Sequence, residues 1–243
     1  MCRHLAYVGP PVTLSSLLYE PSHSLARQSW APRQQEHGTV NADGYGVGWY
    51  APELTGEPAR YRRRGPIWAD RSLPSMARAI RSGAVVAAVR SATPPAPSEE
   101  SGAAPFASGP WLWSLNGAVA GNLEELRRSV SVGRGGQIEG SSDAEVLFAL
   151  VLDRLDGGAD PATALTWLVA SVPGRLNVLL ADGQRIWATR MGDTLWWRRW
   201  GGGVVVGSEP FDDEPGWVVI PDRSVVSSAG ATCSVTTLRT QGA

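Results

Sequence analysis

The chain opens Met1-Cys2-Arg3-His4-Leu5-Ala6-Tyr7-Val8, and this stretch organises the rest of the sequence. Removal of Met1 would make Cys2 the terminal residue, with a thiol and a free α-amine on one carbon. The thiolate is the attacking form of cysteine, and an α-amine with a pKa of about 7.7 to 8.0 accepts a proton near neutral pH. Activation of a nucleophile by the terminal amine is an established arrangement. The stretch therefore predicts a nucleophile that carries its own base.

The residues that follow Cys2 predict a strand. Residues 3–8 are rich in apolar side chains and are followed by Gly9-Pro10-Pro11, so we expect a buried strand that starts at the N-terminus. Free chain ends are normally mobile. A strand that ties the terminus into a sheet is what a catalytic N-terminus needs.

Length and charge narrow the classes of protein and partner. The 243 residues suit one domain, and we expect residues 1–243 to form it. The formal net charge of -1 leaves no basic excess for a phosphate backbone or an anionic membrane. No stretch approaches the roughly 20 apolar residues that span a bilayer, and the N-terminus does not resemble a secretory signal. These features predict a cytoplasmic protein without nucleic-acid or membrane partners.

Cysteine and lysine usage limits the chemistry. Cys2 and Cys233 are too few for a disulfide framework or a four-ligand zinc site, so we expect no metal and no cofactor. All 22 basic residues are arginines, which excludes Schiff-base lysines, a P-loop lysine and Ser-Lys dyads. The imidazoles are His4, His23 and His37. The α-amine of Cys2 leads this short list of bases.

The order of patterns predicts an α+β fold. Two clear helices follow the N-terminal strands: Ser142-x-x-Glu145 is a capping box that starts a helix to about Leu155, and Asp160-Pro161 starts another through Val172. From Arg175 the pattern changes to a meander of short strands. Strands, then helices, then strands indicate sheets that are covered by helices.

Several local boundaries are also predicted. A helix over residues 22–30 has Ser22 as its N-cap, and a helix over residues 72–82 ends at Gly83. A strand over residues 111–115 breaks at Asn116-Gly117, a strong turn dipeptide.

Three stretches allow a functional and a plain interpretation. The glycines of residues 41–46 fit an ordinary turn, or a close approach of the backbone to another group. The arginines of residues 60–64 fit an anion site, but we favour the solvated face of an edge strand. Residues 91–110 are too long for a plain connector, and we interpret them as an active-site flap or a disordered excursion.

Four separated features have a common chemical logic. A thiol that attacks an amide carbonyl needs donors for the developing oxyanion, which the Asn116 side chain and the Gly117 N–H would supply. A γ-glutamyl group also presents an α-carboxylate and an α-ammonium. Arg90 would bind the carboxylate through two parallel hydrogen bonds, and Asp143 would pair with the ammonium.

These motifs resemble a known family. Cys2, Arg90-Ser91-Ala92-Thr93, Asn116-Gly117 and Ser142-Asp143-Ala144-Glu145, in this order, are similar to the class II glutamine amidotransferase domain of the N-terminal-nucleophile hydrolases. The resemblance spans almost the whole chain. It implies a four-layer αββα sandwich, loss of Met1, and Cys2 as nucleophile with its own amine as base.

The resemblance also implies roles for the other residues. It implies an oxyanion hole formed by Asn116 and Gly117, and contacts to the glutamyl moiety from Arg90, Thr93 and Asp143. The opening residues and the run from Asn41 to Trp49 resemble the stand-alone γ-glutamyl hydrolases of ergothioneine biosynthesis. This implies a small-molecule substrate, γ-glutamyl-hercynylcysteine sulfoxide, which is hydrolysed to glutamate and hercynylcysteine sulfoxide through a Cys2 thioester.

Alternatives remain open at this point. The same residues would serve a glutaminase component that supplies ammonia to a separate synthase. A Cys-His hydrolase would use His4 or His37 as the base for its cysteine. A binding module would have no catalytic activity. A homo-oligomer is also open. The 11 tryptophans are mostly expected in sheet packing, although one or two would suit a quaternary ammonium group.

Overall fold

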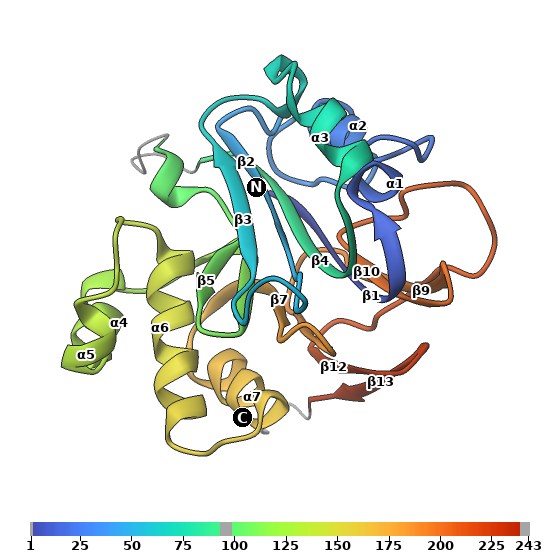
Figure 1. Cartoon of the computed structure of the whole chain (residues 1–243). Helices are drawn as coiled ribbons and strands as arrows, with labels where there is room; N and C mark the ends of the chain where they lie inside the picture. The colour runs from blue at the N-terminus through green and yellow to red at the C-terminus, as the bar shows by residue number, and fades with distance from the viewer. Residues whose placement is uncertain (1, 93–98, 239–243) are drawn as a thin grey trace.

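The computed structural model describes residues 2–92 and 99–238, and in them two antiparallel sheets pack face to face (Figure 1). Helices cover the outer face of each sheet. The architecture is the four-layer αββα sandwich that the sequence predicts.

The first sheet has seven strands in the described part of the chain, in the order β11-β9-β10-β1-β4-β2-β3. Its strands are β1 (Arg3–Thr13), β2 (Gly44–Trp49), β3 (Ala59–Arg63), β4 (Arg81–Arg90), β9 (Trp196–Trp200), β10 (Gly203–Gly207) and β11 (Val218–Val219). Three short helices pack on it: α1 (Leu14–Leu18), α2 (Leu25–Gln28) and α3 (Leu73–Ala79).

The second sheet has six strands among the described residues, in the order β13-β12-β8-β7-β6-β5. Its strands are β5 (Phe106–Ser108), β6 (Trp111–Val119), β7 (Gly174–Ala181), β8 (Ile186–Arg190), β12 (Ser224–Ala229) and β13 (Thr232–Thr237). The helices on this side are α4 (Leu123–Ser129), α5 (Val132–Gly135), α6 (Asp143–Asp156) and α7 (Pro161–Ser171). Two single 3-10 turns, η1 (Ile67–Ala69) and η2 (Glu100–Gly102), lie in connections.

Strand β1 lies inside the first sheet, between β4 and β10. Side chains alternate across a strand: Leu5 and Tyr7 pack in the helix-facing core, whereas Ala6 and Val8 pack between the two sheets. The predicted N-terminal strand is therefore confirmed, and the residue before it is tied to the middle of the sandwich.

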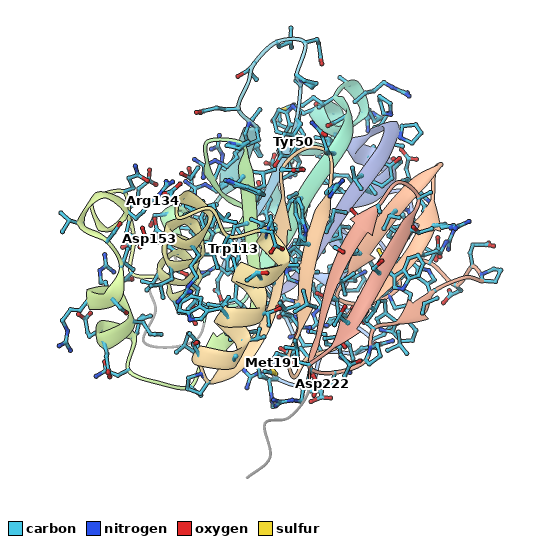
Figure 2. All side chains as sticks on the ribbon, turned by 90° about the horizontal axis from the view of Figure 1, so that it is seen from below. Tyr50, Trp113, Arg134, Asp153, Met191 and Asp222 are labelled. Carbon is cyan, nitrogen blue, oxygen red and sulfur yellow. The ribbon has the colours of Figure 1, made fainter. Side chains whose placement is uncertain are left out.

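The second helical layer is fixed by large side chains. Trp113 of β6, which is labelled in Figure 2, is fully buried. It stacks on Phe148 of α6, with ring centroids 5.5 Å apart. The predicted N-caps of both long helices are confirmed, because Ser142 accepts from the Ala144 N–H and Asp160 accepts from the Thr163 N–H.

Four predicted boundaries are wrong, for different reasons. Strand β1 does not stop at Val8; a bulge between Val8 and Val12 lets it continue through the two prolines and pair again with β4. The second helix begins at Leu25, because Ser24 rather than Ser22 caps it. Helix α3 ends at Ala79, since the following residues already form β4 against β1.

The fourth wrong boundary is the predicted turn at Asn116-Gly117. Strand β6 runs straight through these residues to Val119, because Asn116 pairs with Asn177 and Gly117 pairs with Leu176 of β7. Tertiary pairing thus overrides the local preference of the dipeptide for a turn.

The C-terminal strands do not form one meander. Strands β7, β8, β12 and β13 belong to the second sheet, whereas β9, β10 and β11 belong to the first. A period of two identifies a strand without saying which sheet it joins. The edge-strand interpretation of the arginine run is confirmed, since β3 is the last strand of its sheet.

Candidate active site

Cys2 lies immediately before β1, at the wall of a cavity of about 440 Å³. The cavity combines a polar side with an apolar side. The described residues that line it are Cys2, Ala88, Arg90, Ser91, Ala92, Gly102, Ala104, Phe106, Leu115, Gly117, Ala118, Val119, Gly121, Leu123, Ser141, Ser142, Asp143 and Ala144.

Asn116 lies directly beside Cys2. The Cys2 backbone N donates to Asn116 Oδ1 at 3.0 Å, across 114 residues of sequence. Asn116 is fully buried, and its Nδ2 has no hydrogen-bond partner among the described residues. A buried donor without a partner costs free energy, so a group that accepts from Nδ2 would be stabilised, although Asn116 itself is not among the described residues that line the cavity.

Gly117 lines the cavity and has no room for a side chain. Its φ is +153°, and a Cβ at this position would lie 1.8 Å from the Arg175 carbonyl oxygen of β7. Pairing of β6 with β7 at this register therefore requires glycine, and it leaves the main chain of residue 117 exposed to the cavity.

Arg90 ends β4 and is buried at the cavity. Its carbonyl accepts from the Asp43 N–H at 2.9 Å, and Asp43 Oδ2 accepts from the Ala92 N–H at 2.8 Å. Gly102 packs against the guanidinium, where a Cβ would lie 2.8 Å from Nη2. Two other segments, those of Asp43 and Gly102, therefore position this arginine. Thr93, the other predicted residue of this motif, lies outside the described residues.

Asp143 occupies the first turn of α6 and faces the same cavity. Its Oδ2 accepts from the Val119 N–H at the end of β6 at 3.2 Å, and its Oδ1 accepts from the Ala144 N–H at 2.8 Å. A carboxylate at this position is stabilised by the helix dipole. The interaction joins α6 to the strand that carries Asn116 and Gly117.

The thiol of Cys2 is held in a protonated state by its surroundings. Burial raises the pKa of the Cys2 thiol, and this outweighs a main-chain hydrogen bond from Ser91 and the nearby charge of Arg90, which both lower it. Attack therefore needs a base close to the sulfur.

His4 is not that base. Its ring is fully buried, and its Nδ1 lies 3.0 Å from Ser114 Oγ in the second sheet. Burial, with a smaller contribution from Arg3, lowers the pKa of His4 to about 3. A neutral imidazole with so low a pKa is a poor proton acceptor for a thiol. His37 is exposed and does not line the cavity.

The structure brings Cys2, Arg90, Asn116, Gly117 and Asp143 together. It also adds residues that the sequence did not single out. Gly102 and Phe106 line the cavity, and Asp43, which belongs to the glycine-rich run of residues 41–46, holds the main chain at Arg90 and Ala92. That run makes a close approach, because a Cβ on Gly46 would lie 2.5 Å from the Ala104 carbonyl oxygen.

The aromatic residue of the cavity is Phe106. No tryptophan is among the described residues that line it, and Trp111, Trp113 and Trp187 pack instead in the core beneath α6 and α7. Nothing in the sequence marks Phe106, since it follows a segment without periodicity.

Neither a metal-binding cluster nor a membrane-spanning helix occurs among the described residues. They contain no group of three or more His, Cys, Asp or Glu side chains placed to hold a metal ion. They also contain no helix that is long and apolar enough to cross a membrane.

Comparison with known proteins gives a family match over most of the chain. The family described as "Glutamine amidotransferases class-II" matches residues 15–212, which include the motifs at Arg90, Asn116, Gly117 and Asp143. A protein named γ-glutamyl-hercynylcysteine sulfoxide hydrolase from Mycolicibacterium smegmatis is 43% identical over 240 residues, covering 98% of this chain and 100% of the relative.

Solved structures share the fold. A glutamine aminotransferase class-II domain protein from Silicibacter pomeroyi has a TM-score of 0.72 at 23% identity, covering 98% of this chain and 100% of that one. Glutamine phosphoribosylpyrophosphate amidotransferase from B. subtilis has a TM-score of 0.73 at 14% identity, covering 98% of this chain and 49% of that one. At these identities the likeness shows the architecture alone.

Proposed function

The chain belongs to the class II glutamine amidotransferases, and from this membership we propose that it hydrolyses the γ-glutamyl amide bond of γ-glutamyl-hercynylcysteine sulfoxide, releasing glutamate and hercynylcysteine sulfoxide. The observation that carries the proposal is the hydrogen bond from the Cys2 main-chain nitrogen to Asn116 Oδ1, at the edge of the cavity. This contact joins the Cys2 nitrogen to the Asn116 side chain, and so supports a scheme in which Cys2 reacts next to the Asn116 amide. We propose that residues 1–243 act as a single catalytic domain.

The first step is attack by Cys2 after loss of Met1. The Sγ proton passes to the free α-amine, and the sulfur bonds to the γ-carbonyl carbon. The carbonyl oxygen becomes an oxyanion, for which Asn116 Nδ2 and the Gly117 N–H are the donors. Asn116 Nδ2 supports this role because it is buried and has no partner among the described residues. Preorganised donors of this kind stabilise the tetrahedral intermediate.

The second half of the reaction releases both products. The C–N bond breaks as the Cys2 ammonium gives its proton to the leaving nitrogen, which leaves a γ-glutamyl thioester on Sγ. Water then attacks the thioester with the same amine as base. Glutamate leaves and the thiol is restored.

Arg90 and Asp143 are the proposed binding groups for the glutamyl end. A guanidinium binds an α-carboxylate through two parallel hydrogen bonds, and a carboxylate pairs with an α-ammonium. Both residues line the cavity that contains Cys2, and they come from different layers of the sandwich. Thr93 joins this set as a proposal from the motif alone.

The test compares two substrates on one protein. Purified chain with Met1 removed is incubated with glutamine and with γ-glutamyl-hercynylcysteine sulfoxide, and glutamate release is measured. We expect much faster release from the sulfoxide. Release from glutamine that rises only when a partner synthase is added would replace this proposal with an ammonia-supplying glutaminase.

A pair of cysteine variants tests the nucleophile. Cys2→Ala should abolish turnover and retain substrate binding, whereas Cys233→Ala should keep wild-type activity. Cys233 lies on β13, away from the cavity. Glutamate release by Cys2→Ala would refute the thioester scheme.

A further inference from the structure

Arg3 is buried directly behind the nucleophile. Its side chain has no exposed surface, and its Nε donates to the Cys2 carbonyl oxygen at 2.9 Å. It is not among the described residues that line the cavity, whereas Cys2 is. The guanidinium therefore acts on the nucleophile through the main chain and does not contact the substrate.

The main chain of Cys2 is held at both ends. Its nitrogen donates to Asn116 Oδ1 at 3.0 Å, and its carbonyl accepts from Arg3 Nε at 2.9 Å. These two hydrogen bonds come from different sheets, since Asn116 is on β6 and Arg3 on β1. Together they fix the orientation of the residue whose nitrogen and sulfur both take part in the reaction.

The charge of Arg3 is balanced only at longer range. Asp193 and Glu209 attract it, but both of its Nη atoms lack a hydrogen-bond partner among the described residues. Glu209 is engaged elsewhere: its Oε2 accepts from the Arg33 and Gln34 N–H groups at 2.9 and 2.7 Å. Asp193 Oδ2 lies 3.6 Å from Arg175 Nε. The donation from Nε to the Cys2 carbonyl holds this positive charge next to the main chain of Cys2.

The other charged groups around Cys2 and Arg3 come from several elements. Those near Cys2 are Arg90 of β4 and Asp143 of α6. The neutral ring of His4 faces the other sheet. On the Arg3 side lie Glu36, His37, Arg175, Asp193 and Glu209, with His23 3.3 Å from Glu209 Oε1.

We propose that Arg3 is a positioning residue that orients Cys2 through its carbonyl and whose positive charge keeps the terminal α-amine of Cys2 neutral. This inference rests on the proposed function. A nearby positive charge disfavours the ammonium form of the amine and favours the thiolate form of the thiol. Both effects serve a reaction in which the amine must be free to accept the thiol proton.

The size of the effect is large enough to matter. An α-amine with an ordinary pKa of about 7.8 is neutral in about one molecule in seven at pH 7. A charge within roughly 4 to 6 Å lowers such a pKa by about one or more. With its pKa lowered by about one, the amine is neutral in about 60% of the molecules at pH 7. The free enzyme then has its base available at neutral pH.

The experiment is a pH–rate profile of kcat/KM for γ-glutamyl-hercynylcysteine sulfoxide. Wild type, Arg3→Gln and Arg3→Lys are each prepared with Cys2 exposed by cleavage of an N-terminal tag, and intact mass verifies the terminus. Gln keeps a donor for the Cys2 carbonyl but loses the charge. For Arg3→Gln we expect the acid limb of the kcat/KM profile to move to higher pH by about one unit, and kcat/KM to recover at pH values above this limb. Arg3→Lys keeps the positive charge, so the acid limb of its profile should stay at the wild-type pH, while the plateau value of kcat/KM falls.

An unmoved acid limb in Arg3→Gln, with activity lowered equally at every pH, would overturn the charge role. If Arg3→Gln does not fold, Glu209→Gln decides the question, because it removes an opposing carboxylate and leaves Arg3 intact. The acid limb of Glu209→Gln should move to lower pH. A limb at the wild-type pH or at higher pH would contradict the inference. A wild type that hydrolyses neither substrate at any pH would instead refute the proposed function.

Discussion

At residue 116 the two polar atoms of one amide group have different surroundings. Its Oδ1 accepts from the Cys2 nitrogen, and its Nδ2 is buried without a partner in the described chain. Asn116→Ala removes both functions, so kcat should fall about 10²- to 10³-fold with a much smaller change in KM. Steady-state kinetics measures this split. Asn122→Ala is the matched control, because Asn122 only caps α4 and should leave kcat unchanged. An equal loss in the control would contradict the role of Asn116.

At residue 117 the constraint is steric. Gly117→Ala places a Cβ on the Arg175 carbonyl oxygen at a φ that side chains rarely adopt, so β6 and β7 must separate. We expect a loss of several kcal/mol in the free energy of unfolding, as for other backbone-incompatible substitutions. Gly121→Ala also lines the cavity, but its Cβ would find its nearest contact, Pro173 Cγ, at 3.5 Å. Urea unfolding should therefore show a much lower free energy of unfolding for Gly117→Ala than for Gly121→Ala. Similar values for the two variants would argue against the clash at residue 117.

At the scale of elements, Glu145 holds the loop that leads into α6. Its two carboxylate oxygens accept from the Glu139 and Gly140 N–H groups at 2.7 and 2.8 Å, and it is buried. The sequence predicted a capping box in which Glu145 supports the N-terminus of the helix. In the structure the side chain clamps the preceding loop instead, and so places Ser141 and Ser142 at the cavity.

Glu145→Ala should therefore affect both stability and binding. Two N–H groups of the partly exposed loop lose their acceptor, which costs about 0.5 to 1.5 kcal/mol each. KM for the γ-glutamyl substrate should rise about tenfold, equivalent to about 1.4 kcal/mol. Glu125→Ala, at the same capping-box position of α4 but exposed, is the control. An unchanged KM in Glu145→Ala would show that the loop does not shape the site.

Sequence patterns predicted elements better than their ends. The caps at Ser142 and Asp160 were readable because a side-chain oxygen and its N–H donor are only two or three residues apart. The turn predicted at Asn116-Gly117 failed because the competing interaction, pairing with β7, comes from about 60 residues away in sequence. Phe106 was missed for a related reason, since its place at the cavity depends on pairing of β5 with β6.

At the scale of the whole molecule, the two sheets meet through aliphatic side chains and through a buried polar contact. Ala6, Val86, Leu179 and Ala188 are among the residues of the layer between the sheets. The polar contact joins His4 Nδ1 of β1 to Ser114 Oγ of β6, at 3.0 Å. Cys2 precedes the first of these strands and Asn116 lies on the second, so the contact that joins the sheets also aligns these two residues.

His4 makes the stability of the sandwich depend on pH. Burial lowers the pKa of His4 to about 3 in the folded chain, whereas an unfolded histidine has a pKa of about 6.5. Below pH 6.5 the unfolded chain binds a proton that the folded chain excludes. The contribution of His4 is therefore complete above about pH 6.5 and is lost as the pH falls towards 3, by about 1.4 kcal/mol per pH unit.

His4→Gln should remove this dependence while keeping an amide that can reach Ser114. Urea unfolding at pH 7.5, 6 and 5 should show the stability gap between wild type and His4→Gln narrowing as the pH falls. Ser114→Ala separates the hydrogen bond from the titration, because it lowers stability but keeps the wild-type pH slope. A gap that stays constant in His4→Gln would mean that His4 takes up its proton in the folded chain, and that the contact between the sheets survives an imidazolium.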